Sequence, residues 1–201
     1  MEPECGSCAI EPSALDSAAS WTLYDGVARD LIHLLKYRGV LPAAHWLGEQ
    51  LVALPAANVD VVVPVPLARG RRRERGYNQS EELARVYARQ LGLRCAPRYL
   101  QRERDTRSQT GLNFSARRRN VQGAFRVPRA QAVRGLRLLL IDDVLTTGAT
   151  AQACARACRR AGAAEVHLLT VARAELKSGL RPSDQTSMER PAPTPAGKEA
   201  A

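Results

Sequence analysis

Apolar residues in the first half of the chain follow helical and strand spacing in turn. Residues 27–54 carry leucines and a tryptophan at helical intervals, interrupted at 39–42, which predicts two helices. Residues 60–67 form a β-branched run that ends in prolines, typical of a buried strand that opens into a loop. Residues 80–92 return to helical spacing, with Ser80 as the expected N-cap and a glycine at the end.

The second half of the chain repeats the alternation. Residues 93–100 predict a strand, and 101–124 form a polar, arginine-laden segment that is long for an ordinary loop and therefore indicates function or disorder. Residues 137–143 give the strongest strand signal, followed by a helix of small residues over 150–161 and a strand over 165–172. This order predicts an α/β fold with a mostly parallel, twisted sheet flanked by helices, whose ligands bind at the carboxyl ends of the strands.

The composition divides the chain into three parts. Residues 1–20 are small and polar and are expected to be an irregular lead-in, and residues 21–175 are expected to form the globular domain. Residues 176–201 are rich in Pro, Ser, Thr, Lys and Glu and predict a disordered tail, because such a segment buries too little apolar surface. No run reaches the length of a spanning helix and the start lacks a signal peptide, so we expect no membrane insertion and a cytoplasmic protein.

The formal charge of +10 comes almost entirely from arginine. It favours partners that carry phosphate, such as nucleotides, pyrophosphate or nucleic acid, and does not choose among them. Solvated arginines in an alanine- and arginine-rich composition explain part of the excess, so the arginine clusters are more informative than the total.

Five cysteines are too few and too scattered for a secreted disulfide framework, so reduced thiols are expected. Cys5 and Cys8 have the spacing of one half of a tetrahedral zinc site. Cys154 and Cys158 lie one helical turn apart and are more simply interpreted as small buried residues.

The strand at 137–143 passes directly into Asp-Asp-Val-Leu-Thr-Thr-Gly-Ala-Thr at 142–150. Hydroxyl side chains and a glycine between a strand and a helix let backbone N–H groups surround a phosphate at the positive end of the helix dipole. Ionised carboxylates only accept hydrogen bonds, so Asp142 and Asp143 suit the vicinal hydroxyls of a ribose. Helix capping explains such residues less well, because the acid is doubled and a Thr-Thr-Gly-x-Thr run follows.

Several segments together resemble a known family. They are Leu-Ile-His-Leu-Leu-Lys-Tyr-Arg-Gly at 31–39, Val-Pro-Val-Pro-Leu at 63–67, Arg-Gly-Tyr-Asn-Gln at 75–79, Gln-Thr-Gly-Leu at 109–112, Asn-Val-Gln-Gly-Ala-Phe at 120–125 and the acidic Thr-Thr-Gly motif. The chain resembles the ComF/GntX family of competence proteins over roughly residues 5–173, and its motif at 138–150 resembles that of type I phosphoribosyltransferases. The resemblance implies the type I phosphoribosyltransferase fold and a site for 5-phosphoribosyl-1-pyrophosphate (PRPP) with Mg²⁺.

The resemblance also assigns roles to residues of this chain. Asp142 and Asp143 would hold the ribose hydroxyls and be the catalytic residues. The PRPP-binding motif continues through Val144, Leu145, Thr146, Thr147, Gly148, Ala149 and Thr150, of which the last five surround the 5-phosphate. The arginine-rich loop after the strand at 60–67 would contact pyrophosphate through Pro66, Leu67, Ala68, Arg69, Gly70 and Arg75.

Three functions remain compatible with the residues. The first is an active phosphoribosyltransferase that displaces pyrophosphate without a covalent nucleophile, with the segment at 102–119 as a mobile loop over the site. The second is a non-catalytic module that binds PRPP or a nucleotide among competence proteins. The third is a protein that grips single-stranded DNA with its arginines, although aromatic residues for base stacking are scarce. The family's zinc finger needs two Cys-x-x-Cys pairs, and only Cys5 and Cys8 are present.

Overall fold

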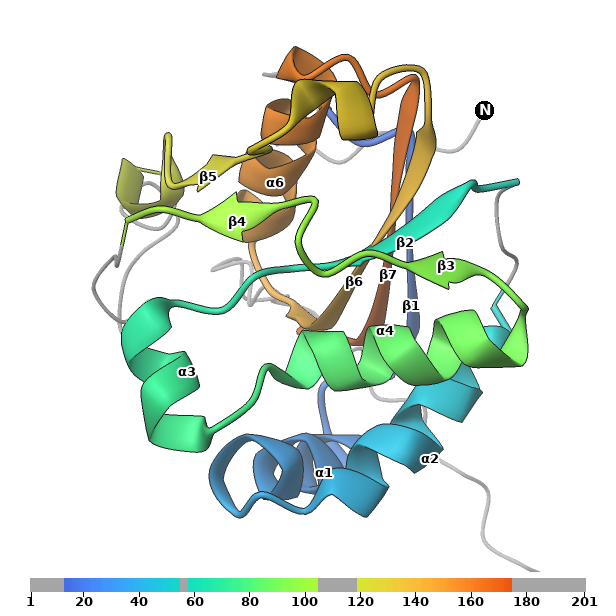
Figure 1. The fold of residues 1–201 in the computed structure, drawn as a ribbon. Helices are drawn as coiled ribbons and strands as arrows, with labels where there is room; N and C mark the ends of the chain where they lie inside the picture. Colours follow the sequence, from blue (N-terminus) through green and yellow to red (C-terminus); the bar gives the residue numbers. More distant parts are fainter. Residues whose placement is uncertain (1–12, 55–57, 105–118, 175–201) are drawn as a thin grey trace, which may run out of the picture.

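The computed structural model describes residues 13–54, 58–104 and 119–174. Its centre is a five-stranded parallel sheet in the order β1-β7-β6-β2-β3 (Figure 1). The strands are β1 (Ser17–Leu23), β2 (Val61–Pro64), β3 (Arg94–Cys95), β6 (Arg137–Leu145) and β7 (Glu165–Arg173). The predicted α/β architecture with a parallel sheet is therefore confirmed.

Helices cover both faces of this sheet (Figure 1). One face carries α1 (Gly26–Tyr37), α2 (Leu41–Val52) and α4 (Gln79–Gln90), with α2 packed closely on α4. The other face carries α6 (Ala149–Arg160) and a short antiparallel hairpin of β4 (Gln101–Arg102) and β5 (Phe125–Arg126). A 3₁₀ turn at Ala130–Ala132 leads into β6. The described residues include no helix of the length and apolarity that crossing a membrane requires.

The central strands are buried on both faces because alternate residues enter different cores. Leu138 and Leu140 of β6 pack with α6, whereas Leu139 and Ile141 pack with α2 and α4. All four side chains are almost fully buried. An uninterrupted aliphatic run is therefore what this strand needs, and its carboxyl end is held rigidly where it leaves the core.

Two segments differ from the sequence-based prediction. The expected lead-in to residue 20 contains most of β1, an edge strand whose first four residues are small and whose one large apolar side chain packed on the core is Trp21. It is held by parallel pairing to β7 and by the bond between the hydroxyls of Ser20 and Thr170, 2.7 Å apart. The arginine-rich stretch expected as a loop forms α3 (Arg69–Arg75) and ends at Gly76, whose positive φ of 82° stops the helix.

Candidate functional site

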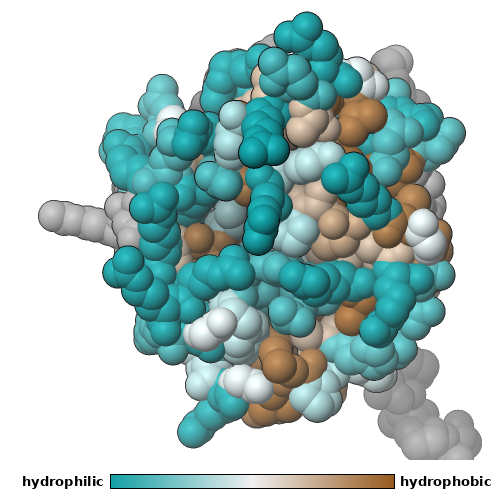
Figure 2. All heavy atoms as spheres, viewed as in Figure 1, coloured by the Kyte–Doolittle hydropathy of each residue, from teal (hydrophilic) through white to brown (hydrophobic). Residues whose placement is uncertain are grey.

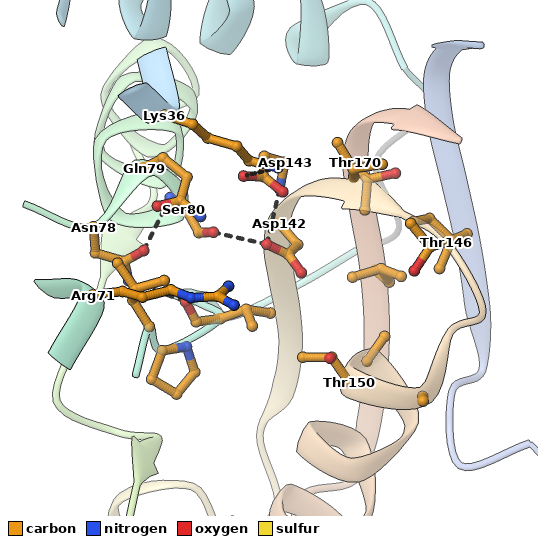
Figure 3. A pocket seen from close by; sticks show the side chains of 18 of the residues that line it. Lys36, Arg71, Asn78, Gln79, Ser80, Asp142, Asp143, Thr146, Thr150 and Thr170 are labelled. Carbon is orange, nitrogen blue, oxygen red and sulfur yellow. Dashed lines mark hydrogen bonds and ion pairs between the residues drawn. The ribbon is translucent and has the colours of Figure 1, made fainter. Parts of the chain in front are cut away.

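A cleft of about 340 Å³ opens at the carboxyl ends of β2 and β6 (Figure 3). Its walls come from the end of α1, the β2–α3 connection, the start of α4 and the β6–α6 turn. Strand ends and helix starts meet here because all strands of the sheet run parallel. The cleft therefore lies where the sequence predicted the ligand site.

The acid pair lies near the end of a strand, not in a loop. β6 runs on to Leu145, and Asp142 is paired in register with Thr170 of β7. Successive strand residues point to opposite faces, so Asp142 and Asp143 extend to different sides of the strand. The strand predicted over 137–143 therefore runs two residues further, because pairing with β7 continues to Leu145.

Asp142 reaches the first turn of α4 across the cleft. Its Oδ1 accepts hydrogen bonds from Ser80 Oγ at 2.8 Å and from the Asp143 amide at 2.9 Å. Burial, together with the charge of Asp143, raises the pKa of Asp142 to about 7, although both hydrogen bonds and Lys36 oppose the rise. This carboxyl group therefore changes charge near neutral pH.

Asp143 faces α1 instead. Its side chain is 7% exposed, and Oδ2 lies 3.0 Å from Nζ of Lys36, whose side chain is 17% exposed. Burial opposes the charge on Lys36, but the carboxylate of Asp143 outweighs burial and raises the pKa of the lysine above its ordinary value. The pair is therefore a charged lysine and an acid held together at the wall of the cleft.

The predicted phosphate cradle falls on the turn after β6. Gly148 is the N-cap of α6 with φ of 73°, a left-handed conformation that side chains with a Cβ rarely adopt. Thr146, Gly148, Ala149 and Thr150 line the cleft, as do Val144 and Leu145 before them. Thr147 does not line it, and its Oγ1 lies 3.4 Å from the Ala149 amide. The first turn of α6 therefore opens into the cleft with its positive dipole end.

The β2–α3–α4 segment forms the opposite wall. Pro66, Leu67 and Arg75 line the cleft as expected, whereas Ala68 is buried as the N-cap of α3 and is not among the lining residues. Arg71 lines the cleft with Arg75, because residues four apart share one face of a helix. Arg69 and Gly70 do not line the cleft, so the helix changes which residues of this segment reach the site.

Asn78 is the N-cap of α4, and its side chain links the start of that helix to the chain just after β2. Its side chain accepts a bond from the Ser80 amide at 3.2 Å and donates one to the Val65 carbonyl at 3.0 Å. The N-cap is therefore Asn78 and not Ser80, which leaves the Ser80 hydroxyl to bond Asp142. One polar segment thus fixes the end of β2, the start of α4 and the acid pair.

Sequence analysis did not predict every residue that lines the cleft. The missed lining residues with polar or aromatic side chains are Tyr24, Lys36, Tyr37, Arg71, Asn78, Gln79, Ser80, Arg102 and Thr170. Segments already quoted for the family resemblance contain Lys36, Tyr37, Asn78 and Gln79, so the motif at 31–39 was the available signal for α1. Thr170 had no comparable signal, because the two residues on each side of it in β7 are apolar.

The predicted zinc half-site is not tested by the structure. Cys5 and Cys8 lie outside the described residues. Within the ranges that the structure describes, no three His, Cys, Asp or Glu side chains are grouped to hold a metal ion. Cys154 and Cys158 are buried in α6, and burial raises the pKa of both thiols. Their expected role as small buried residues agrees with that position.

Comparisons with known proteins agree with this geometry. The family model of the phosphoribosyl transferase domain matches residues 77–189. DNA utilization protein YhgH of Salmonella typhi is 34% identical over 177 residues, which cover 84% of this chain and 77% of that protein. Competence protein F of Haemophilus influenzae is 33% identical over 116 residues, covering 57% of this chain and 51% of that protein.

A solved structure of glutamine phosphoribosylpyrophosphate (PRPP) amidotransferase from B. subtilis, complexed with ADP and GMP, is also similar. It is 26% identical with a TM-score of 0.47, and the likeness covers 65% of this chain and 26% of that enzyme. The family match begins at Tyr77 and contains both the acid pair and the turn before α6.

Proposed function

The chain belongs to the phosphoribosyl transferase domain family, among its ComF-like members, and on that premise we propose that the cleft binds the ribose 5-phosphate part of PRPP or of a nucleotide. The predicted type I phosphoribosyltransferase fold is confirmed by the same match and by the parallel sheet. The observation that carries the proposal is the meeting of an acid pair and a helix start within nine residues of one cleft wall.

The two ends of this cleft wall suit different parts of the ligand. Asp142 and Asp143 accept hydrogen bonds from the ribose hydroxyls, and the amides at 146–150 surround the 5-phosphate. The short stretch of chain between them keeps the phosphate away from the carboxylates. This division explains why the carboxylates end the strand and the glycine starts the helix.

The pyrophosphate of PRPP would lie toward α3. Arg71 and Arg75 line that side of the cleft, and Pro66 and Leu67 form its floor. Arg75 is oriented by Gln79, whose Oε1 accepts a bond from its Nη1 at 2.9 Å, and it stacks over the Tyr37 ring at 5.3 Å. Guanidinium groups suit phosphate oxygens because they donate several bonds in one plane.

Mg²⁺ would enter with the pyrophosphate. Magnesium prefers few protein ligands together with substrate phosphates, and the described residues offer no cage of acidic or histidine side chains. When bound, it would neutralise charge on the leaving pyrophosphate. The residues of this chain would contribute by holding and orienting the ribose ring.

We expect calorimetry to detect binding of ribose 5-phosphate at pH 8 and tighter binding of PRPP with Mg²⁺. PRPP should gain because its pyrophosphate adds contacts with the arginines of α3. Ribose without phosphate is the control and should bind at least about tenfold more weakly, since charge-assisted hydrogen bonds are worth about 1.5–3 kcal/mol. Equal binding of ribose and ribose 5-phosphate would contradict the phosphate cradle.

Turnover is a separate question from binding. If the chain is an enzyme, incubation with PRPP, Mg²⁺ and a panel of nucleobases releases pyrophosphate. Binding without release from any base identifies a non-catalytic module, a role compatible with the names of the relatives, which refer to DNA utilization and competence. We extend participation in DNA uptake, and with it a cytoplasmic location, to this chain as part of the proposal.

One observation favours a second function, binding of single-stranded nucleic acid. Residues 69–104 contain eleven arginines and four glutamates, whereas residues 13–54 contain three basic and four acidic residues. Figure 2 shows hydrophilic side chains spread across the face that bears α3, α4 and the β4–β5 hairpin. An excess of arginines on an exposed surface is typical of proteins that bind phosphate backbones.

We expect an oligonucleotide to bind this face with an affinity that falls steeply with salt, because each neutralised phosphate releases counterions. Replacing the exposed Arg73 and Arg98 by glutamine should lower the slope of log K against log salt by about two. Saturating ribose 5-phosphate is the control and should leave oligonucleotide binding unchanged. Weak binding that does not depend on salt would exclude this function.

A further inference from the structure

Lys36 reaches the acid pair from a different layer of the molecule. Figure 3 shows its side chain extending from α1 to Asp143, where Nζ and Oδ2 are 3.0 Å apart. Both side chains are largely withdrawn from solvent, at 17% and 7% exposure. A lysine that is removed from water needs a partner, so the placement of Lys36 and the charge of Asp143 depend on each other.

The end of α1 is tied to the cleft at three consecutive residues. The Leu35 carbonyl accepts a hydrogen bond from Tyr77 Oη, Lys36 pairs with Asp143, and the Tyr37 ring lies under Arg75. These contacts come from the segment before α4, from β6 and from α3. The position of the ammonium group is therefore set by the fold of the site and not by a freely moving side chain.

The two carboxyl groups belong to adjacent residues and interact. The Asp142 carboxyl group already has a pKa of about 7, raised by burial and by the Asp143 carboxylate, and the positive charge of Lys36 lowers it. Several other polar or charged groups line the same cleft: Tyr24 after β1, Arg71 and Arg75 from α3, Ser80 from α4, Arg102 from β4 and Thr170 from β7. Lys36 is paired directly with one acid of the couple, Asp143.

We propose that Lys36 is a positioning residue that neutralises Asp143, so that Asp142 ionises near neutral pH and not above it, and in its ionised form accepts hydrogen bonds from a ribose. The role rests on the proposed function of the cleft. Without the lysine, two uncompensated carboxylates would lie side by side in a partly dry site, and one of them would take up a proton. A protonated acid loses acceptor capacity and becomes a donor, which weakens its bond with a hydroxyl.

The test compares Lys36→Met with the unaltered protein in ribose 5-phosphate titrations from pH 7 to pH 9. We expect the ratio of the two Kd values to fall at least about fivefold across this range, as Asp142 of the variant ionises later. Both proteins bind the same phosphate, so its own titration near pH 6 cancels in the ratio. A loss that is constant with pH would show that Lys36 only packs α1, and would overturn the proposal.

Two further variants isolate the charge. Lys36→Arg keeps a cation and should restore a flat ratio, and Lys36→Met with Asp143→Asn removes the uncompensated charge and should flatten it as well. Arg29→Met is the matched control, since Arg29 also pairs with an acid on α1, Asp30 at 3.4 Å, but is exposed. It should leave the Kd unchanged at every pH.

A ligand-free measurement separates this proposal from the proposed function. Carboxyl carbon NMR should show the Asp142 titration midpoint at least about one pH unit higher in Lys36→Met than in the unaltered protein. If the unaltered protein binds no ribose 5-phosphate, the proposed function fails and this shift still tests the charge role of Lys36. An unmoved midpoint would overturn that role whatever the ligand result.

Discussion

Replacing Gly148 by alanine is expected to weaken ribose 5-phosphate binding by at least about 100-fold and to destabilise the fold by about 1–2 kcal/mol. The residue is the N-cap of α6 with φ of 73°, where a Cβ is strained by that order of energy. Relief of the strain would turn the amides that begin α6 away from the phosphate, and losing two charge-assisted bonds costs about 3–6 kcal/mol. Calorimetry measures the first effect and thermal unfolding the second.

Gly135→Ala is the matched control for this experiment. Gly135 also has φ of 73°, and an added Cβ there meets no atom within 4 Å. It lies before β6, at the end of the strand away from the cleft. The control should lose similar stability with no change in affinity. Comparable weakening in both variants would mean that lost stability, and not the cradle, explains the result.

The chemistry of the turn was readable from sequence because it is local. The strand, the acid pair and the start of α6 are adjacent in the chain, and each residue type has one physical use there. The same holds for β2 and β6, whose aliphatic runs follow from burial on both faces. Residues that are adjacent in the chain were therefore enough to predict where the candidate ligand site lies in the sheet.

Contacts between distant segments could not be read in this way. Lys36 and Asp143 are far apart in sequence, and only the packing of α1 near the end of β6 makes them a pair. Spacing rules place Lys36 on a helix but do not predict which residue its side chain contacts. Likewise, β1 owes its strand conformation largely to pairing with β7, since its first four residues are only serines and alanines.

The arginines after β2 show another reason why the lining residues could not all be predicted from sequence. The family resemblance implied a pyrophosphate-binding loop here, but seven residues of the segment, five of them arginines, form α3. Helical geometry then selects Arg71 and Arg75 for the cleft and leaves Arg69 outside the lining. The predicted chemistry of the segment is retained as a proposal, while the residues that carry it change.

Asp142→Asn is expected to weaken ribose 5-phosphate binding at pH 8 by about 10- to 100-fold. The amide keeps an oxygen that accepts the bonds from Ser80 and the Asp143 amide, so the local structure is retained. The charge that strengthens a bond from a ribose hydroxyl is lost, at a cost of about 1.5–3 kcal/mol. Calorimetry at pH 8 measures the change, and unchanged affinity would remove Asp142 from the site.

The same substitution should stabilise the ligand-free protein at high pH. The Asp142 pKa is raised from 3.8 to about 7, so between these values the folded state holds a proton that the unfolded state has released. Stability from this group therefore falls as pH rises, and the loss is complete above about pH 7. The asparagine variant avoids the loss, so its gain over the unaltered protein should be absent below about pH 3.8 and greatest above about pH 7.

Asp60→Asn supplies a control of opposite sign. Its carboxylate accepts bonds from the Arg137 side chain and amide, which lower its pKa from 3.8 to about 2. Asp60 therefore stabilises the fold above pH 3.8, and this contribution is lost as pH falls through 2, so its amide variant should unfold at lower temperature at pH 8. Thermal unfolding of both variants at pH 8 and near pH 4 compares the two signs. If Asp142→Asn were destabilising at pH 8, the acid would stabilise β6. A binding group that costs stability would instead make the asparagine variant more stable at this pH.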